Sequence, residues 1–185
     1  MNYGTFSGNP VTEWLVDAAG GDRDMRMVQD FSFTDPKKRV WPAPTGAIVN
    51  GASIPRPLWS TVGSPFTDDY RRASLVHDVA CSTAGVVRKE ADEMFYYACL
   101  AGGCGLLQAR VLYAGVRIGA WAGAALPADS ISKDRLLFRP VAAARGLEEQ
   151  FLKTKLDAIS SDIRALPKRA TLKDLDMIID QHIKV

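Results

Sequence analysis

The chain has 185 residues, of which 47% are hydrophobic and 24% charged, so it holds enough apolar side chains for a packed core and lacks the composition of a disordered protein. Its 23 basic residues nearly balance its 21 acidic ones, and this excludes a strong electrostatic signal for nucleic-acid binding. The three cysteines lack metal-ligand spacing, which is typical of a reducing compartment and not of a disulfide scaffold. We expect neither a bound metal nor a cofactor.

Residues 1–66 have the pattern of strands and loops. Apolar side chains alternate with polar ones at Met25, Met27, Phe31 and Phe33, which is the two-residue period of half-buried strands. Residues 35–38 have the composition of a turn, so residues 25–41 are predicted to form a hairpin. The many prolines and glycines after it prevent long regular elements.

From residue 67 onward the pattern becomes helical, and helices are predicted over about 67–83, 88–101 and 105–122. The first helix is expected to be capped by one of residues 67–69, and the pair Gly102-Gly103 is expected to end the second. The predicted fold is α+β, with a small antiparallel sheet or hairpin region followed by a three-helix core within residues 1–126. The segment 105–126 is long and apolar, but Arg110 and Arg117 interrupt it. It is therefore predicted to be a buried core helix and not a transmembrane span.

The C-terminal part is predicted to be a linker over residues 127–146 and a helical tail over residues 147–185. The tail carries apolar residues at alternating steps of four and three, a seam like that of a coiled coil. Two interpretations stay open: the seam docks on another protein or on a second copy of this chain, or it folds back on its own core. Thr171 and Asp174 form a capping box that opens a last helix. The seam residues are Leu152, Leu156, Ile159, Ile163 and Leu166.

His77 lies within a predicted helix and is the stronger of the two histidines as a candidate for chemistry. On a helix it shares one stripe with Tyr70, Ser74 and Cys81, whereas Asp78 is rotated about 100° away. His77 can therefore act with Ser74, with Cys81, or with a group from another element. A buried structural histidine is the other interpretation.

A carboxylate for His77 is available on the next helix. Asp92 follows Arg88 by four residues, so it either forms a surface ion pair or points inward toward His77. If it points inward, it fixes the His77 tautomer and makes the imidazole a general base, while Asp78 could hold a metal. His77 and Cys81 could instead supply a thiolate nucleophile or two metal ligands, although no third and fourth ligand is evident.

A helical His-Asp pair with a carboxylate from the following helix resembles the secreted phospholipases A2. The resemblance covers only about 20 residues. The chain lacks the disulfides and the clear Gly-rich calcium loop of those enzymes, and Cys81 stands where they place a tyrosine.

A second resemblance is longer. Residues 46–59, together with 70–78 and 94–96, resemble a domain-of-unknown-function family that is common in tailed phages and prophages, and the match covers about residues 22–122. The family signature reads approximately Asp-Gly-Ala-Ser-Ile-Pro-Arg, followed by His-Asp, and this chain has Asn where the signature begins with an acid. The signature residues either contact an anion or substrate, or hold the loop to the helices, and we favour the second interpretation. They are Asn50, Gly51, Ser53, Pro55 and Arg56.

The resemblance implies a phage virion structural or assembly protein, a tail, portal or interior component that acts through protein–protein contacts. Its expected location is the virion, or the host cytoplasm during assembly. The alternative is a hydrolase acting on a lipid or envelope substrate through a site centred on His77, with Asp92, Asp78 and Cys81. In either case the loop 50–56 is expected to pack against the helix that carries His77.

Overall fold

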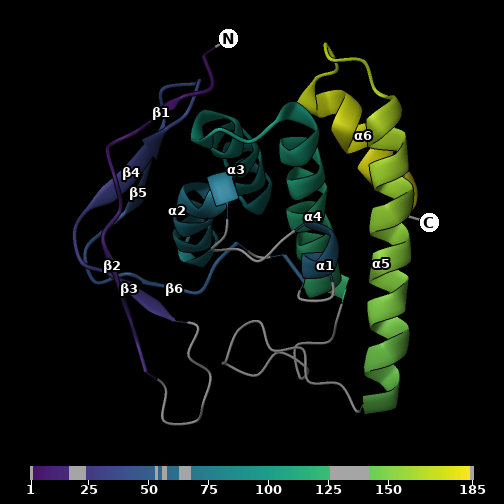
Figure 1. The fold of residues 1–185 in the computed structure, drawn as a ribbon, viewed down its shortest axis with the longest axis horizontal. Coiled ribbons are helices and arrows are strands. Elements are labelled where there is room, and N and C mark those ends of the chain that lie inside the picture. The colour runs from purple at the N-terminus through teal and green to yellow at the C-terminus, as the bar shows by residue number, and fades with distance from the viewer. Residues whose placement is uncertain are drawn as a thin grey trace. The chain divides into compact units, whose positions relative to one another are not determined.

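The computed structural model describes residues 2–16, 24–52, 54–55, 58–62, 68–125 and 142–183, and it confirms the α+β fold (Figure 1). The strands are β1 (Thr5–Phe6), β2 (Thr12–Trp14), β3 (Met25–Met27), β4 (Phe31–Thr34), β5 (Val40–Ala43) and β6 (Ile48–Val49). The helices are α1 (Trp59–Val62), the 3-10 turn η2 (Asp68–Tyr70), α2 (Arg71–Ser82), α3 (Arg88–Gly102), α4 (Leu106–Ala125), α5 (Ala142–Ala165) and α6 (Leu172–Ile183).

The chain divides into two compact units. The first contains the strands β1 to β6 with η2, α2 and α3, and the second contains α1, α4, α5 and α6. Helix α4, which the sequence placed in the three-helix core, is thus grouped with the C-terminal helices. Of the expected linker, residues 127–141 lie outside the described residues, and α5 already begins at Ala142. The boundaries at 126 and 146 stay predictions.

The strands of the first unit form two antiparallel sheets, with the orders β1-β4-β5 and β2-β3-β6. The predicted alternation is confirmed, because Met25, Met27, Phe31 and Phe33 are all buried. The predicted hairpin with its turn at 35–38 is confirmed as the pair β4–β5, but its extent is wrong, because β3 at the start of the range 25–41 pairs with β2 and β6. The side-chain period identifies which face of a strand is buried, but the choice of neighbouring strand depends on contacts distant in sequence.

The turn between β4 and β5 depends on Asp35. Its Oδ1 accepts the backbone N–H of Arg39 at 3.0 Å, and its Oδ2 accepts the indole N–H of Trp41 at 3.0 Å. Lys38 adopts a φ of 68° in this turn. An aspartate that bonds nearby backbone groups is the expected organiser of such a turn, and here it also fixes a buried tryptophan.

Helix α2 is the centre of the first unit. It packs against α3 and against β4, β5 and β6, so its residues from Ala73 to Asp78 are all buried. The predicted cap at residues 67–69 is only partly described: Asp68 and Asp69 lie in η2, Thr67 lies outside the described residues, and Tyr70 at the N-cap makes no capping side-chain bond. The 3-10 turn therefore occupies the place where a side-chain cap was expected.

Helix α3 ends at a pair of glycines, as the sequence predicts. Gly103 adopts a left-handed conformation with a φ of 114°, and its N–H bonds back to the carbonyl groups of Cys99 and Leu100. Gly102 is required for a different reason, because a Cβ at this position would collide with the carbonyl oxygen of Asp69. The end of α3 thus lies directly against η2.

We expect Gly102→Ala to lower the free energy of unfolding by about 1–3 kcal/mol, because the backbone of Asp69 must move away from the new methyl group. Chemical denaturation measures the loss. Gly105→Ala is the matched control, since no atom lies within 4 Å of its Cβ position, and it should be neutral. Equal effects of the two substitutions would contradict the close approach.

In the second unit, α5 packs against both α4 and α6 (Figure 1). Arg110, although buried in an apolar helix, donates from one terminal nitrogen to the carbonyl groups of Pro167, Lys168 and Ala170 at 3.0–3.2 Å. The capping box is confirmed, because Asp174 accepts the backbone N–H of Thr171 at 2.7 Å. Among the described residues, none of the helices combines the length and apolar character that a membrane span requires.

The apolar seam of α5 lies inside this unit. Leu152, Leu156, Ile159 and Ile163 are at most 5% exposed, and Leu166 is half-buried. The partners of α5 are α4 and α6, whose own apolar side chains, such as Leu112 and Ile179, are also buried. Of the two interpretations left open, the structure shows folding back within the chain. Because these side chains are already covered, the seam is not an exposed docking surface.

Candidate functional site

His77 lies at the middle of α2, where its side chain is fully buried. Its ring packs against Phe95 of α3 with 4.8 Å between the ring centroids. A buried imidazole needs hydrogen-bond partners, since leaving one unpaired would cost about 1–3 kcal/mol. These partners come from α3 and from the next turn of α2.

Asp92 points inward and accepts a hydrogen bond at its Oδ1 from Nε2 of His77 at 2.8 Å. The same oxygen accepts Nε of Arg88 at 2.9 Å. The sequence offered an ion pair with Arg88 or an inward acceptor as alternatives, and the structure combines them: Asp92 is fully buried, while the Arg88 side chain stays 34% exposed and reaches over it.

Cys81 lies one turn after His77 on the same face of α2, as the helical spacing predicts. Its Sγ is 3.5 Å from Nε2 and 3.8 Å from Nδ1 of His77, and its side chain is partly exposed. Nε2 is already bonded to Asp92, so Nδ1 is the nitrogen left for a proton transfer, although the nearly equal distances place the sulfur in line with neither N–H in this structure. Ser74, the other candidate partner on this stripe, donates to the carbonyl of Tyr70 and does not bond to His77.

The charges around His77 are strongly coupled. Burial alone would lower the pKa of His77, but negative charge at Cys81 and the hydrogen bond to Asp92 outweigh burial and raise this pKa to about 9. Burial alone would raise the pKa of Asp92, but the hydrogen bond and charge of His77, with the charge of Arg88, hold it below its ordinary value. At neutral pH the imidazole is therefore protonated and the carboxylate ionised.

Asp78 faces away from this network and toward the signature loop. It accepts the backbone N–H of Asn50 at 2.6 Å and also that of Gly51. Burial raises the pKa of Asp78, while these donors and the charge of His77 act in the opposite direction. A calcium site of the phospholipase A2 kind needs oxygen ligands around the carboxylate. Here the neighbouring loop presents N–H donors to Asp78.

His77, Cys81 and Asp92 each offer one metal-ligand atom within 4.8 Å of the other two. This set supplies the third ligand that was not evident from the sequence. However, the Arg88 guanidinium is bonded to the same oxygen of Asp92, and this fixed cation repels a divalent ion at that position. The donor set therefore fits a charged hydrogen-bond network better than a metal centre.

The signature loop is divided between the two units. Asn50 and Gly51 are tied to α2 through Asp78, and Gly51 adopts a φ of 110°, which favours glycine. In the second unit, Ile54 packs on Gly115 of α4 and its carbonyl accepts the indole N–H of Trp59 at 3.0 Å. Pro55 is buried. Ser53 and Arg56 lie outside the described residues, so the expected contact of Ser53 with His77 stays a prediction.

The first unit also has a cavity that the sequence does not predict. It lies between β2 and the start of α2 and includes Trp14 and Arg71 in its lining. These residues are far apart in sequence and belong to no shared motif, so no spacing could have joined them. His77, Cys81 and Asp92 do not line this cavity.

Comparison with known proteins assigns a family but no activity. Residues 25–116 match the family described as "Protein of unknown function (DUF1353)". The chain is similar to the uncharacterized protein y4jT of Sinorhizobium fredii (strain NBRC 101917 / NGR234), with 38% identity over 115 residues that cover 60% of this chain and 32% of that protein. It is also similar to the uncharacterized protein y4iH of the same organism, with 34% identity over 99 residues that cover 54% of this chain and 41% of that protein.

The chain thus spans less than half the length of these two relatives. No solved structure matches it. The matched region contains α2 and α3 complete, and with them His77, Cys81, Asp92 and Arg88. Residues 25–116 of this chain are therefore a domain of the DUF1353 family, a family of unknown function.

Proposed function

We propose that the domain is a hydrolase in which Cys81 is the nucleophile and His77, held by Asp92, transfers the proton. One observation carries this proposal: a partly exposed thiol lies against a buried imidazole whose other interaction is with a buried carboxylate. A nucleophile beside a base that is oriented by a third group is the general arrangement of covalent hydrolases. Of the three residues only Cys81 is partly exposed, and it is therefore the one that we propose meets the substrate.

The pKa of about 9 at His77 decides the order of the proton transfers. An imidazole that is already protonated at neutral pH cannot begin as the general base that the sequence predicted. It instead places a positive charge beside the Cys81 sulfur, and we propose that this charge stabilises the thiolate that attacks the substrate. The charge of Asp92 is balanced by Arg88.

In the first step the Cys81 sulfur attacks an ester carbonyl and an S–C bond forms. The tetrahedral adduct collapses, the C–O bond to the alcohol breaks, and the departing oxygen takes the proton from Nδ1 of His77. His77 is then neutral and removes a proton from water, whose oxygen attacks the thioester. Collapse of the second adduct releases the carboxylic acid and restores the thiolate and the imidazolium.

For the substrate we propose a lipid or cell-envelope ester. Support comes from the bond between His77 and Asp92, which supplies the carboxylate from the following helix that the resemblance to secreted phospholipases A2 implies. The proposed mechanism departs from that of those enzymes in two respects. The nucleophile is a cysteine in place of an activated water, and Asp78 binds backbone N–H groups.

We expect iodoacetamide to alkylate Cys81 of the native protein selectively, because Cys81 is partly exposed and lies beside the His77 imidazole. Peptide mass spectrometry identifies the modified residue, and the buried Cys99 and Cys104 in the same chain are internal controls. In parallel, turnover of p-nitrophenyl esters of short and long acids is measured together with any acyl-enzyme mass increase. Turnover should fall to background in Cys81→Ser and in His77→Gln.

Two results would contradict the proposal in different ways. Turnover that survives Cys81→Ser but is lost in His77→Gln would indicate a water nucleophile. If no ester is turned over and Cys81 reacts no faster than Cys99, the network is purely structural.

A location in a phage particle remains a separate proposal, supported by the family resemblance of the signature residues. The α5 seam no longer supports it, because its side chains are covered within the chain. If the proposal is right, mass spectrometry of purified particles detects peptides of this protein in a fixed ratio to capsid protein. If washing the particles removes this protein, the proposed location in the particle is contradicted.

A further inference from the structure

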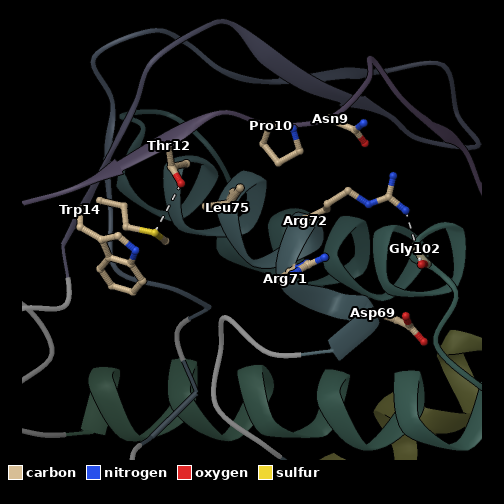
Figure 2. Close-up of a pocket in the computed structure, with 10 residues that line it drawn as sticks. Asn9, Pro10, Thr12, Trp14, Asp69, Arg71, Arg72, Leu75 and Gly102 are labelled. Carbon is tan, nitrogen blue, oxygen red and sulfur yellow. Dashed lines mark hydrogen bonds between the residues drawn. The ribbon is translucent and has the colours of Figure 1, made fainter.

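A second candidate site lies in the first unit, at the cavity between β2 and the start of α2 (Figure 2). Its volume of about 590 Å³ falls in the range of roughly 300–1,000 Å³ that is usual for small-molecule sites. Figure 2 shows Trp14 at one end, Asp69 and Gly102 at the other, and Arg71, Arg72 and Leu75 along α2 between them. The site is independent of the Cys81 network, so it goes beyond the proposed hydrolase.

One part of the cavity is apolar. Trp14 is 64% exposed on β2, although large aromatic side chains are normally covered. Met25 and Leu75 are buried beside it, and the Thr12 hydroxyl donates to the Met25 sulfur at 3.6 Å, which fixes the thioether in place. This end can accept a flat apolar group against the indole.

The other part carries positive charge. Arg72 is held in the wall, with its guanidinium 4.6 Å from the Phe6 ring centroid and a 3.5 Å bond to the carbonyl of Gly102. Arg71 is exposed, and within the described part of the chain it has no hydrogen bond or ion pair. Among the described residues that line the cavity, the positive charges of two arginines thus exceed the negative charge of Asp69.

We propose that this cavity binds a small molecule in which an acidic group, a carboxylate or a phosphate, is joined to an aromatic ring. The acidic group bonds to the exposed guanidinium of Arg71, whose planar donors match both kinds of oxyanion. The ring stacks on Trp14 and contacts Met25 and Leu75. The charge of Arg72 adds attraction without having to leave its present partners.

The test uses phenyl phosphate and phenylacetate as probes and benzyl alcohol as the neutral counterpart. Titration of the full chain is followed by the indole N–H cross-peak of Trp14 in ¹⁵N NMR spectra, assigned with Trp14→Phe. We expect saturable shifts with the acidic probes and binding of benzyl alcohol at least about tenfold weaker. The tighter of the two acidic probes identifies the acidic group.

Arg71→Gln should weaken the acidic probes about tenfold and leave benzyl alcohol unchanged. Trp14→Ala lacks the indole reporter, so its titration is followed by the backbone amide cross-peak of Leu75, which also lines the cavity, and it should weaken all three probes. Arg169→Gln is the matched control, because Arg169 is an exposed arginine of the second unit, and it should have no effect. The proposal is overturned if the acidic probes give no saturable shift, if the neutral probe binds equally well, or if Arg71→Gln has no effect. None of these results bears on the Cys81 chemistry, whose readout is ester turnover.

Discussion

Replacing Asp92 with alanine is expected to lower the free energy of unfolding by about 3–5 kcal/mol. The substitution removes the acceptor that both His77 and Arg88 share, and His77 is fully buried. Breaking a buried ion pair from one side is costly because the remaining charged group keeps its desolvation penalty without its partner. Urea denaturation of the wild-type and variant chains measures the loss.

Glu90→Ala is the matched control on the same helix. Glu90 also pairs with an arginine, Arg39, at 2.6 Å, but both side chains are about half exposed. Exposed pairs contribute about 0–1 kcal/mol, so the control should change little. Comparable losses in the two variants would show that the His77 network contributes no more than a surface ion pair.

The same network makes stability depend on pH. The pKa of His77 rises from its ordinary 6.5 to about 9 on folding, so its contribution is complete below pH 6.5 and is lost as the pH rises through about 9. The pKa of Asp92 is lowered on folding, so its contribution is present above the ordinary value of 3.8 and is lost in acid. Stability should therefore decline on the alkaline side in the wild type and decline less in Asp92→Ala.

The elements that the sequence predicts best are those fixed by local chemistry. The glycine pair after α3 stops that helix, and the Thr171–Asp174 box starts α6, because both signals act within a few residues. The extent of the predicted hairpin was wrong for the opposite reason. Met25 and Phe31 alternate in the same way, yet β3 and β4 belong to different sheets, and only contacts with β2, β5 and β6 decide this.

The candidate site was predictable in its helical part and ambiguous where two helices meet. Spacing alone placed Cys81 beside His77 on α2. The direction of Asp92 was not predictable, because Arg88 four residues earlier is compatible with a surface pair as well as with the buried, shared carboxylate that the structure shows. The charge state of His77 depends on burial and on both neighbours, and none of these can be obtained from spacing.

Replacing Ile159 with alanine is expected to lower the free energy of unfolding by about 2–5 kcal/mol without changing the oligomeric state. Ile159 is fully buried in α5, which packs on α4 and α6 of the same chain, so the missing methyl and methylene groups leave a cavity inside the second unit. Thermal unfolding measures the loss, and light scattering measures the mass in solution. Met177→Ala is the control, because Met177 on α6 is 61% exposed and its truncation should be nearly neutral.

Ile159→Ala distinguishes a seam that packs inside one chain from a seam that joins two chains, because the two roles predict different changes in stability and in mass. A seam that serves only the interior of the second unit gives a large stability loss at constant mass. A seam that holds two copies together gives a decrease in mass, with a stability loss that shrinks as the protein is diluted. The burial of Leu156, Ile159 and Ile163 against helices of their own chain favours the first outcome, and a decrease in mass would restore assembly as the role of α5.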